Sequence, residues 1–376
     1  MMTVPGIGHS QKFWTMNGSY QMEQVDATLR GVRDDVMIYV DDSIWDRKIT
    51  PNDVAELQTR LHDQTPEGSI QPHSGIISVE RQLFQKEKTP VTLLLTESDA
   101  PFEGFFTPMD LLPETEALQY GGHSNERPMV HLNTGRVKEG DSPAAHLGPI
   151  FSHEVQHLYH YQHDQDEETW LRELLAQGAM NLTGHRDVEL ELQSKNSPTA
   201  PILTGEEEMA NYPGLTSFAA HLQKEFGPEI LIRLNRHPAN GVESVNAVLA
   251  EMGSDETFDS VLRDHFVEQA EKRIAAGQAL ERYRVGDAGG LLPAQVRPGG
   301  AEFIDLSNSN PLNLTVDGWQ DGLFLERLVI GEHGVRREPL DVGSGCVQLP
   351  PGRRQLLMLG SSEPAASVQL SFSPSV

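Results

Sequence analysis

The sequence holds a single cysteine, Cys346, among its 376 residues. One cysteine excludes an intrachain disulfide framework and any zinc site built on cysteine thiolates. A metal site in this chain would therefore have to use histidine and carboxylate ligands. There is also no internal repeat, and the content of proline and glycine, 24 and 33 residues, does not indicate disorder or a collagen-like chain.

Long apolar runs are missing as well. None approaches the roughly 18 residues that a membrane-spanning helix needs. The opening residues, Met-Met-Thr-Val-Pro-Gly-Ile-Gly, lack a basic stretch followed by an apolar one, so they do not predict a secretion signal. This pattern fits either a cytoplasmic protein or a chain from which a signal was trimmed, and the sequence alone does not choose between them.

Positive charge is scarce. The chain has 29 Lys and Arg against 55 Asp and Glu, which gives a formal net charge of -26. We expect no nucleic-acid partner, because proteins that bind nucleic acids need a basic surface. Apolar residues make up 38% of the chain, enough for a real core, and the length favours two domains.

The first domain is predicted to span residues 1–285 in an α+β arrangement. Its opening part is predicted to form strands and loops with a few helices, because short β-leaning apolar runs occur at 36–40, 91–95 and 129–132. Thr50 has the features of a residue that caps the start of a helix. From Ser142, followed by a proline suited to the first helical position, the pattern turns helical as far as about residue 285.

The remainder of the chain is predicted to form a linker and a second domain. Residues 286–300 are dense in turn-forming residues, which is typical of a linker. Residues 301–376 are predicted to form a small all-β sandwich of unknown role, because short alternating apolar runs occur there, at 312–316, 323–329 and 355–359.

The segment Phe151-Ser-His-Glu-Val-Gln-His-Leu carries the strongest chemical signal. His153 and His157 are four residues apart, so on a helix they share a face and can reach one metal ion. Zinc bound there would lower the pKa of its water, and Glu154 could take the water's proton as general base and pass it to the leaving amine. Phe151, Val155 and Leu158 would form a buried stripe on the opposite side of the helix.

Two residues compete as the third zinc ligand. His163 fits the spacing of the pattern His-Glu-x-x-His-x-x-Gly-x-x-His, but His160 stands where that pattern needs a helix-breaking glycine. On a continuing helix, His163 would point about 100° away from the histidine pair. Glu173 lies beside an apolar stripe on a second predicted helix, and a partly buried carboxylate is costly unless it is paired or bound to metal.

The residues His153-Glu-Val-Gln-His157 followed by Thr169-Trp-Leu-Arg-Glu173 resemble the pattern of the gluzincin zinc metallopeptidases, and most closely that of the hyicolysin-type bacterial metallopeptidases. Segments at 39–42, 104–110 and 217–227 extend the resemblance over roughly residues 35 to 275. The resemblance implies Zn²⁺ as cofactor, hydrolysis of protein or peptide substrates, a zincin-type fold with a mixed-sheet lobe and a helical lobe, and an extracellular or cell-surface location. It also implies that Glu173 is the third ligand.

Some positions depart from the family pattern. Leu174 replaces a glycine after the glutamate ligand, and Gln177 stands where a carboxylate often holds a ligand histidine in place. These departures favour, mildly, an alternative function: a catalytically weak or inactive peptidase-fold protein that serves as a binding or cell-surface module. The intact Glu154 argues against that alternative.

The remaining polar residues carry weaker signals. Tyr212 occupies about the place of the tyrosine that stabilises the developing oxyanion in related gluzincins, although a packing role in a turn is equally compatible with the sequence. His160 is predicted to lie at the surface or behind the ligands. The acidic residues Asp164, Asp166, Glu167 and Glu168 are predicted to form a solvated turn, with a calcium site as the less favoured alternative. No chemistry is assigned to Asp110.

Overall fold

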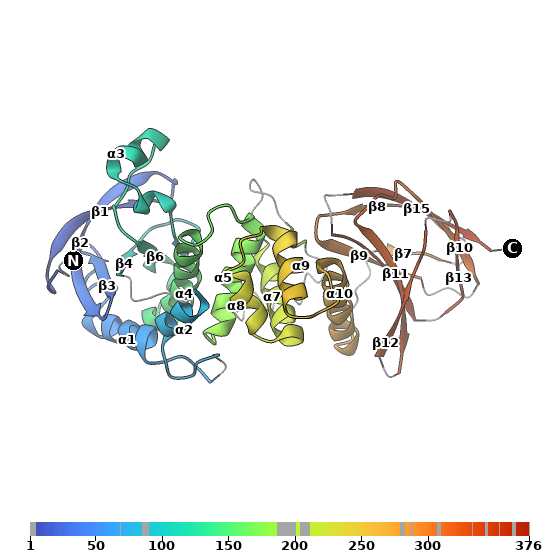
Figure 1. Ribbon diagram of the computed structural model, residues 1–376, viewed down its shortest axis with the longest axis horizontal. Coiled ribbons are helices and arrows are strands. Elements are labelled where there is room, and N and C mark those ends of the chain that lie inside the picture. Colours follow the sequence, from blue (N-terminus) through green and yellow to red (C-terminus); the bar gives the residue numbers. More distant parts are fainter. Residues whose placement is uncertain are drawn as a thin grey trace. The chain divides into compact units, whose positions relative to one another are not determined.

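The fold is described from a computed structural model of the chain (Figure 1). The structure describes residues 5–67, 69–84, 90–185, 201–203, 211–278, 283–286, 289–306, 310–332, 334–342, 345–352, 354–362 and 366–375. By their internal contacts the residues group into two units. The first comprises residues 1–167, 175–187 and 228–238, and the second comprises residues 168–174, 188–227 and 239–376.

The first unit is built on a six-stranded mixed sheet with the strand order β1-β2-β3-β4-β6-β5. The strands β1, β2 and β3 run antiparallel, β3, β4 and β6 run parallel, and the short edge strand β5 is antiparallel to β6. Every residue of β4 is buried, which is typical of a central parallel strand covered on both faces. The strand bounds are β1 Ser10–Met16, β2 Met22–Arg33, β3 Val36–Asp41, β4 Val91–Thr96, β5 Gly104–Phe105 and β6 Met129–Asn133.

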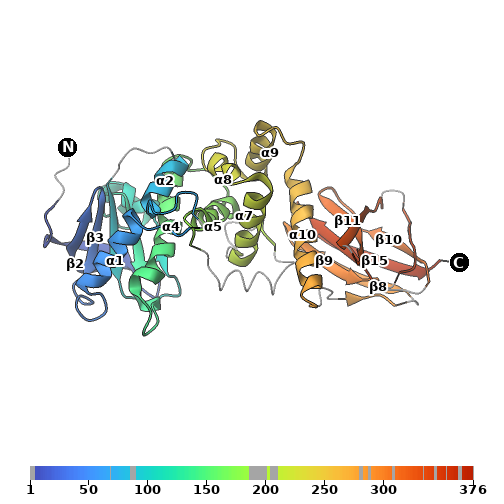
Figure 2. The same ribbon diagram turned by 90° about the horizontal axis from the view of Figure 1, so that it is seen from below.

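The helices of the first unit include α1 (Pro51–His62), α2 (Ile76–Phe84), α4 (Pro143–Tyr161) and α8 (Glu229–Leu234). Of these, α1, α2 and α4 lie beside the sheet (Figure 2). The helix α4 packs against α1, α2 and β6. The short elements of this unit are α3 (Glu114–Ala117) and the 3-10 turns Pro108–Leu111, Leu118–Tyr120 and Thr134–Arg136.

Two helix starts follow directly from the sequence. Thr50 caps α1 in a reciprocal capping box with Asp53, as the Thr-Pro-Asn-Asp sequence predicts. Ser142 caps α4 by accepting a hydrogen bond from the backbone nitrogen of Ala145 at 3.2 Å, with Pro143 as the first helical residue. The predicted strands at 36–40, 91–95 and 129–132 are confirmed as β3, β4 and β6.

The second unit combines helices with two β-sheets. Its helices include α7 (Tyr212–Phe226), α9 (Gly241–Glu251) and α10 (Phe258–Ala275), and α5 (Thr169–Leu182) begins among its residues. Of the predicted helical stretch, residues 186–200, 204–210 and 279–282 lie outside the described residues. The expectation that the pattern stays helical as far as about residue 285 is wrong, because α10 ends at Ala275 and residues 283–284 form strand β7.

Two sheets in this unit share one hydrophobic core, as a β-sandwich requires. One has the strand order β13-β10-β15-β8 and the other β12-β11-β14-β9-β7. The predicted strands at 312–316, 323–329 and 355–359 are confirmed as β10, β11 and β14. The strand bounds are β7 Tyr283–Arg284, β8 Gly290–Val296, β9 Gly300–Asp305, β10 Leu312–Asp317, β11 Leu323–Gly331, β12 Gly334–Pro339, β13 Val347–Leu349, β14 Gln355–Ser361 and β15 Ala366–Pro374.

The predicted linker at 286–300 is wrong for most of its described residues. Gly290–Val296 forms β8, which pairs antiparallel with β15 along its whole length. The turn-forming composition of this segment did not prevent a strand, because long-range pairing and burial of Ala294 and Val296 in the sandwich core offset weak local propensity. Residues 287–288 lie outside the described residues. The separate folding of residues 301–376 stays a prediction.

The described helices include none that is both long enough and apolar enough to cross a membrane.

In the described part of the chain, the secondary structure is a mixture of helices and sheets, which confirms the α+β class.

Candidate metal centre

The helix α4 presents the two candidate histidines on one face. His153 and His157 are one turn apart, and their Nε2 atoms face each other at 3.1 Å. The opposite stripe of the helix is formed by Phe151, Val155 and Leu158, all of which are fully buried, as the sequence predicts. Burial of this stripe fixes the rotation of α4 about its axis and therefore the direction in which the histidines point.

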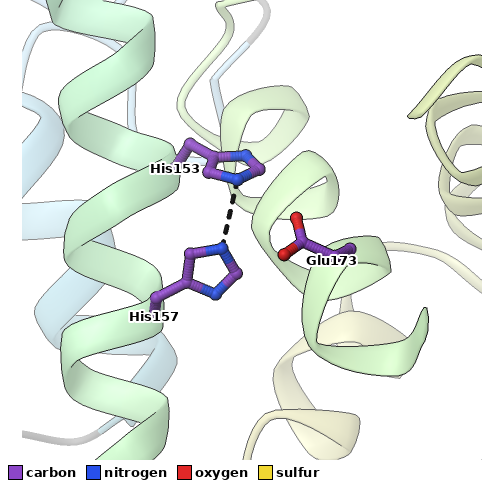
Figure 3. A group of neighbouring side chains, drawn as sticks. All are labelled: His153, His157 and Glu173. Atoms are coloured by element: carbon purple, nitrogen blue, oxygen red, sulfur yellow. Dashed lines mark hydrogen bonds between the residues drawn. The ribbon is translucent and has the colours of Figure 1, made fainter. Parts of the chain in front are cut away.

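Glu173, on α5, lies close to this pair of histidines. His153, His157 and Glu173 each offer one ligand atom, and these atoms all lie within 4.8 Å of one another (Figure 3). His153 is 9% exposed, while His157 and Glu173 are half-buried. Partial burial of Glu173 next to the buried Trp170 and Leu174 confirms what the spacing of α5 predicts.

The donor set fits zinc. Two imidazole nitrogens and one carboxylate oxygen are typical of zinc sites that keep a position open for water or substrate. Donors about 2.1 Å from one tetrahedral zinc ion stand about 3.4 Å apart, close to the 3.1 Å between the two Nε2 atoms. The two histidines therefore need only small adjustments to hold one ion, and a ligand atom of Glu173 lies within 4.8 Å of theirs.

Gln177 contacts the second ring nitrogen of His153, Nδ1. Its side-chain nitrogen lies 3.3 Å from Nδ1 of His153, and it is buried on α5 one turn after Glu173. This contact engages Nδ1 and leaves Nε2 as the ligand atom of His153. A neutral imidazole that ligates through Nε2 carries its proton on Nδ1. Rotation of the amide by half a turn would bring the Gln177 oxygen to that proton as acceptor.

The sequence did not reveal a buried carboxyl group next to the site, that of Glu80 on α2. Ser152, the neighbour of His153, donates a hydrogen bond to Glu80 Oε1 at 2.7 Å, and the Glu80 side chain is fully buried. Burial raises the pKa of Glu80 to about 8, although the hydrogen bond from Ser152 opposes this change. In the metal-free chain, a pKa of about 8 keeps most of Glu80 protonated at neutral pH, so it anchors α4 as a neutral group.

A second anchor of α4 was also missed. The amide of Gln156, fully buried, donates to Asn235 Oδ1 at 2.9 Å, and Asn235 in turn donates to the backbone oxygen of Leu231. Asn235 is the residue at the end of α8, so this pair ties the middle of α4 to that helix. In the sequence, Gln156 is simply one of the two variable positions between the histidines.

Other predicted site residues are placed as follows. Glu154 lies on α4 directly after His153 and is 7% exposed. Tyr212 is the first residue of α7 and is half-buried, and its role as oxyanion donor stays a prediction. His163 lies beyond the end of α4 at Tyr161 and is exposed; within the described residues it belongs to no group of converging ligands.

The surroundings of His160 correct two expectations. His160 is 1% exposed, so of the two positions expected for it, at the surface or behind the ligands, the surface position is wrong. Glu167, expected in a solvated turn, is 3% exposed, whereas Asp166 and Glu168 of the same turn are exposed as expected. Ligand atoms of His160, Asp164 and Glu167 lie within 4.8 Å of one another. Acidic composition alone predicted solvent exposure and therefore missed this cluster.

Asp110 belongs to a closed polar network of the first unit. It is fully buried, accepts hydrogen bonds from Asn125 at 2.7 and 3.0 Å, and pairs with His131 Nε2 at 2.8 Å. His131 also contacts Thr15 and stacks on Phe105. All of these polar groups are engaged with one another in the buried interior, so the network holds the loop after β5 in place.

No protein-family model matches the chain, and no curated protein matches it.

Proposed function

We propose that the chain is a zinc-dependent endopeptidase of the gluzincin type, with His153, His157 and Glu173 as metal ligands. The observation that carries the proposal is the convergence of these three side chains from two helices, with their ligand atoms within 4.8 Å of one another. The mixed sheet with α4 alongside is compatible with the zincin-type catalytic unit that the resemblance implies.

The chain's own residues divide the chemistry between them. When bound, zinc supplies a water of lowered pKa and polarises the peptide carbonyl. Glu154, about 100° round the helix from His153, accepts a proton as the water oxygen attacks the carbonyl carbon, and returns it to the amine nitrogen as the carbon–nitrogen bond breaks. Tyr212 is proposed, on the resemblance alone, to donate to the developing oxyanion. Protein or peptide substrates and an extracellular or cell-surface location are likewise proposed from the resemblance.

Substitution of Glu154 tests this function. Glu154→Gln is nearly isosteric and does not remove a ligand, so zinc content and fold should be retained. Hydrolysis of casein should fall by about 10² to 10⁴, the usual contribution of general acid–base catalysis. The matched control is Glu139→Gln, at an exposed loop position of the first unit, which should keep full activity.

Two outcomes would contradict the proposal. Equal hydrolysis by wild type and Glu154→Gln would place the catalyst elsewhere. A zinc-loaded wild type that cleaves no protein or peptide substrate would instead favour the binding-module alternative, and the amide at Gln177 in place of a carboxylate would be the first feature to examine.

A further inference from the structure

The histidine-bearing face of α4 continues beyond the proposed catalytic ligands. His160 follows His153 by seven residues, which is close to two helical turns, so both side chains leave the same face of the helix. His160 is in the last turn of α4, which ends at Tyr161. Asp164 and Glu167 follow in the connection that leads to α5.

His160, Asp164 and Glu167 converge in the same way as the first group. Each offers one ligand atom, and these atoms lie within 4.8 Å of one another. His160 and Glu167 are 1% and 3% exposed, and Asp164 is half-buried. This cluster thus combines a buried imidazole with two carboxylates that are largely withdrawn from water.

The backbone orients the Asp164 carboxylate. The backbone nitrogen of Asp164 donates to the backbone oxygen of His160 at 2.7 Å, which closes the turn at the end of α4. Oδ1 of Asp164 accepts a hydrogen bond from the backbone nitrogen of Asp166 at 3.0 Å. Oδ2 is buried, and no hydrogen-bond donor in the described ranges of the chain reaches it. A buried carboxylate oxygen of this kind needs a cation or a proton.

Charge and donor type indicate which cation would fit. Two carboxylates beside one imidazole keep an excess of negative charge even when the imidazole is protonated, whereas a divalent ion with a neutral imidazole balances the cluster. Calcium prefers six to eight oxygen ligands, so a nitrogen donor favours a first-row transition ion.

We propose that His160, Asp164 and Glu167 form a second, structural zinc site that ties the end of α4 to the turn before α5. The proposal does not depend on the peptidase function, because it concerns different ligands. The structural role of this second zinc site is to stabilise the connection between α4 and α5, the segment that leads to Glu173.

The test is the number of zinc ions that the purified full-length chain binds, measured by elemental analysis and by competition with a chromophoric chelator. Wild type should bind two zinc ions per chain. Asp164→Asn and Glu167→Gln should each bind one, and Glu173→Gln should bind one as well. The matched control Asp166→Asn, at an exposed position of the same turn, should bind two.

The outcomes separate the two sites. If Asp164→Asn and Glu167→Gln both bind as many zinc ions as wild type, the second site is overturned. A wild type that binds one ion, lost in Asp164→Asn but kept in Glu173→Gln, would support this site and contradict the catalytic one. If the variants fail to fold, the wild-type chain alone decides. A wild type that binds one zinc ion, and that loses peptidase activity when this ion is removed, would contradict the proposal. A site that takes calcium but not zinc would overturn the assignment of the metal.

Discussion

The buried Glu80 makes a quantitative prediction about stability and pH. Its pKa is raised from 4.5 to about 8 in the folded chain, chiefly because burial removes the carboxylate from water. Between these two values the folded state keeps a proton that the unfolded state has released. Stability contributed by this group is therefore complete below about pH 4.5 and is lost progressively as the pH rises through 8.

The size of this effect follows from the two pKa values. Each pH unit between them is worth about 1.4 kcal/mol, so ionising Glu80 in place should cost about 5 kcal/mol of unfolding free energy above pH 8. Glu80→Gln removes the titration while keeping a carbonyl oxygen that can accept the hydrogen bond from Ser152. The variant should therefore gain stability relative to wild type as the pH rises from 5 to 8.5.

Urea denaturation at a series of pH values measures the difference. Taking the variant relative to wild type cancels the contributions of groups that titrate equally in both proteins. The unfolding free energy of Glu139→Gln, a variant in an exposed loop of the same unit, should change with pH in the same way as that of wild type. Parallel curves for Glu80→Gln as well would refute the argument, because they would show that Glu80 titrates alike in the folded and unfolded states.

Two further predictions concern packing around the ligands and within the sandwich. Gln177→Glu should tighten zinc binding by about tenfold or more, because a carboxylate facing Nδ1 of His153 makes the imidazole a stronger ligand; unchanged affinity in a chelator competition would contradict this. Gly360→Ala should cost about 1–3 kcal/mol, since the added Cβ would meet the ring of Phe324 at 2.1 Å, whereas Gly331→Ala, with its nearest contact at 3.5 Å, should be nearly neutral. Equal unfolding midpoints for the two glycine variants would refute that reasoning.

Local signals explain the parts of the structure that the sequence predicts well. The capping residues Thr50 and Ser142 act through bonds to backbone groups three residues away, so a short stretch of sequence contains the whole interaction. The face shared by His153 and His157 is equally local, because helical periodicity alone brings them together. The apolar stripe of a second helix made Glu173 a candidate ligand, and the resemblance to the gluzincin pattern favoured it over His163.

Long-range contacts explain what the sequence did not predict. Strand β8 exists because it pairs with β15, about 75 residues later in the chain. Glu80 and Glu167 are charged residue types that tertiary packing has buried, and no local pattern distinguishes them from surface glutamates. Polar residues whose burial depends on distant partners were therefore the ones placed wrongly or overlooked.

The most direct test of the central claim is an anomalous difference map at the zinc absorption edge, from crystals of the wild-type chain grown with zinc. The account predicts a peak about 2.0–2.2 Å from Nε2 of His153, Nε2 of His157 and a carboxylate oxygen of Glu173. It also predicts that the peak disappears in Glu173→Ala and remains in His163→Ala. No peak between the two histidines, or a peak ligated by His163 in place of Glu173, would contradict the account.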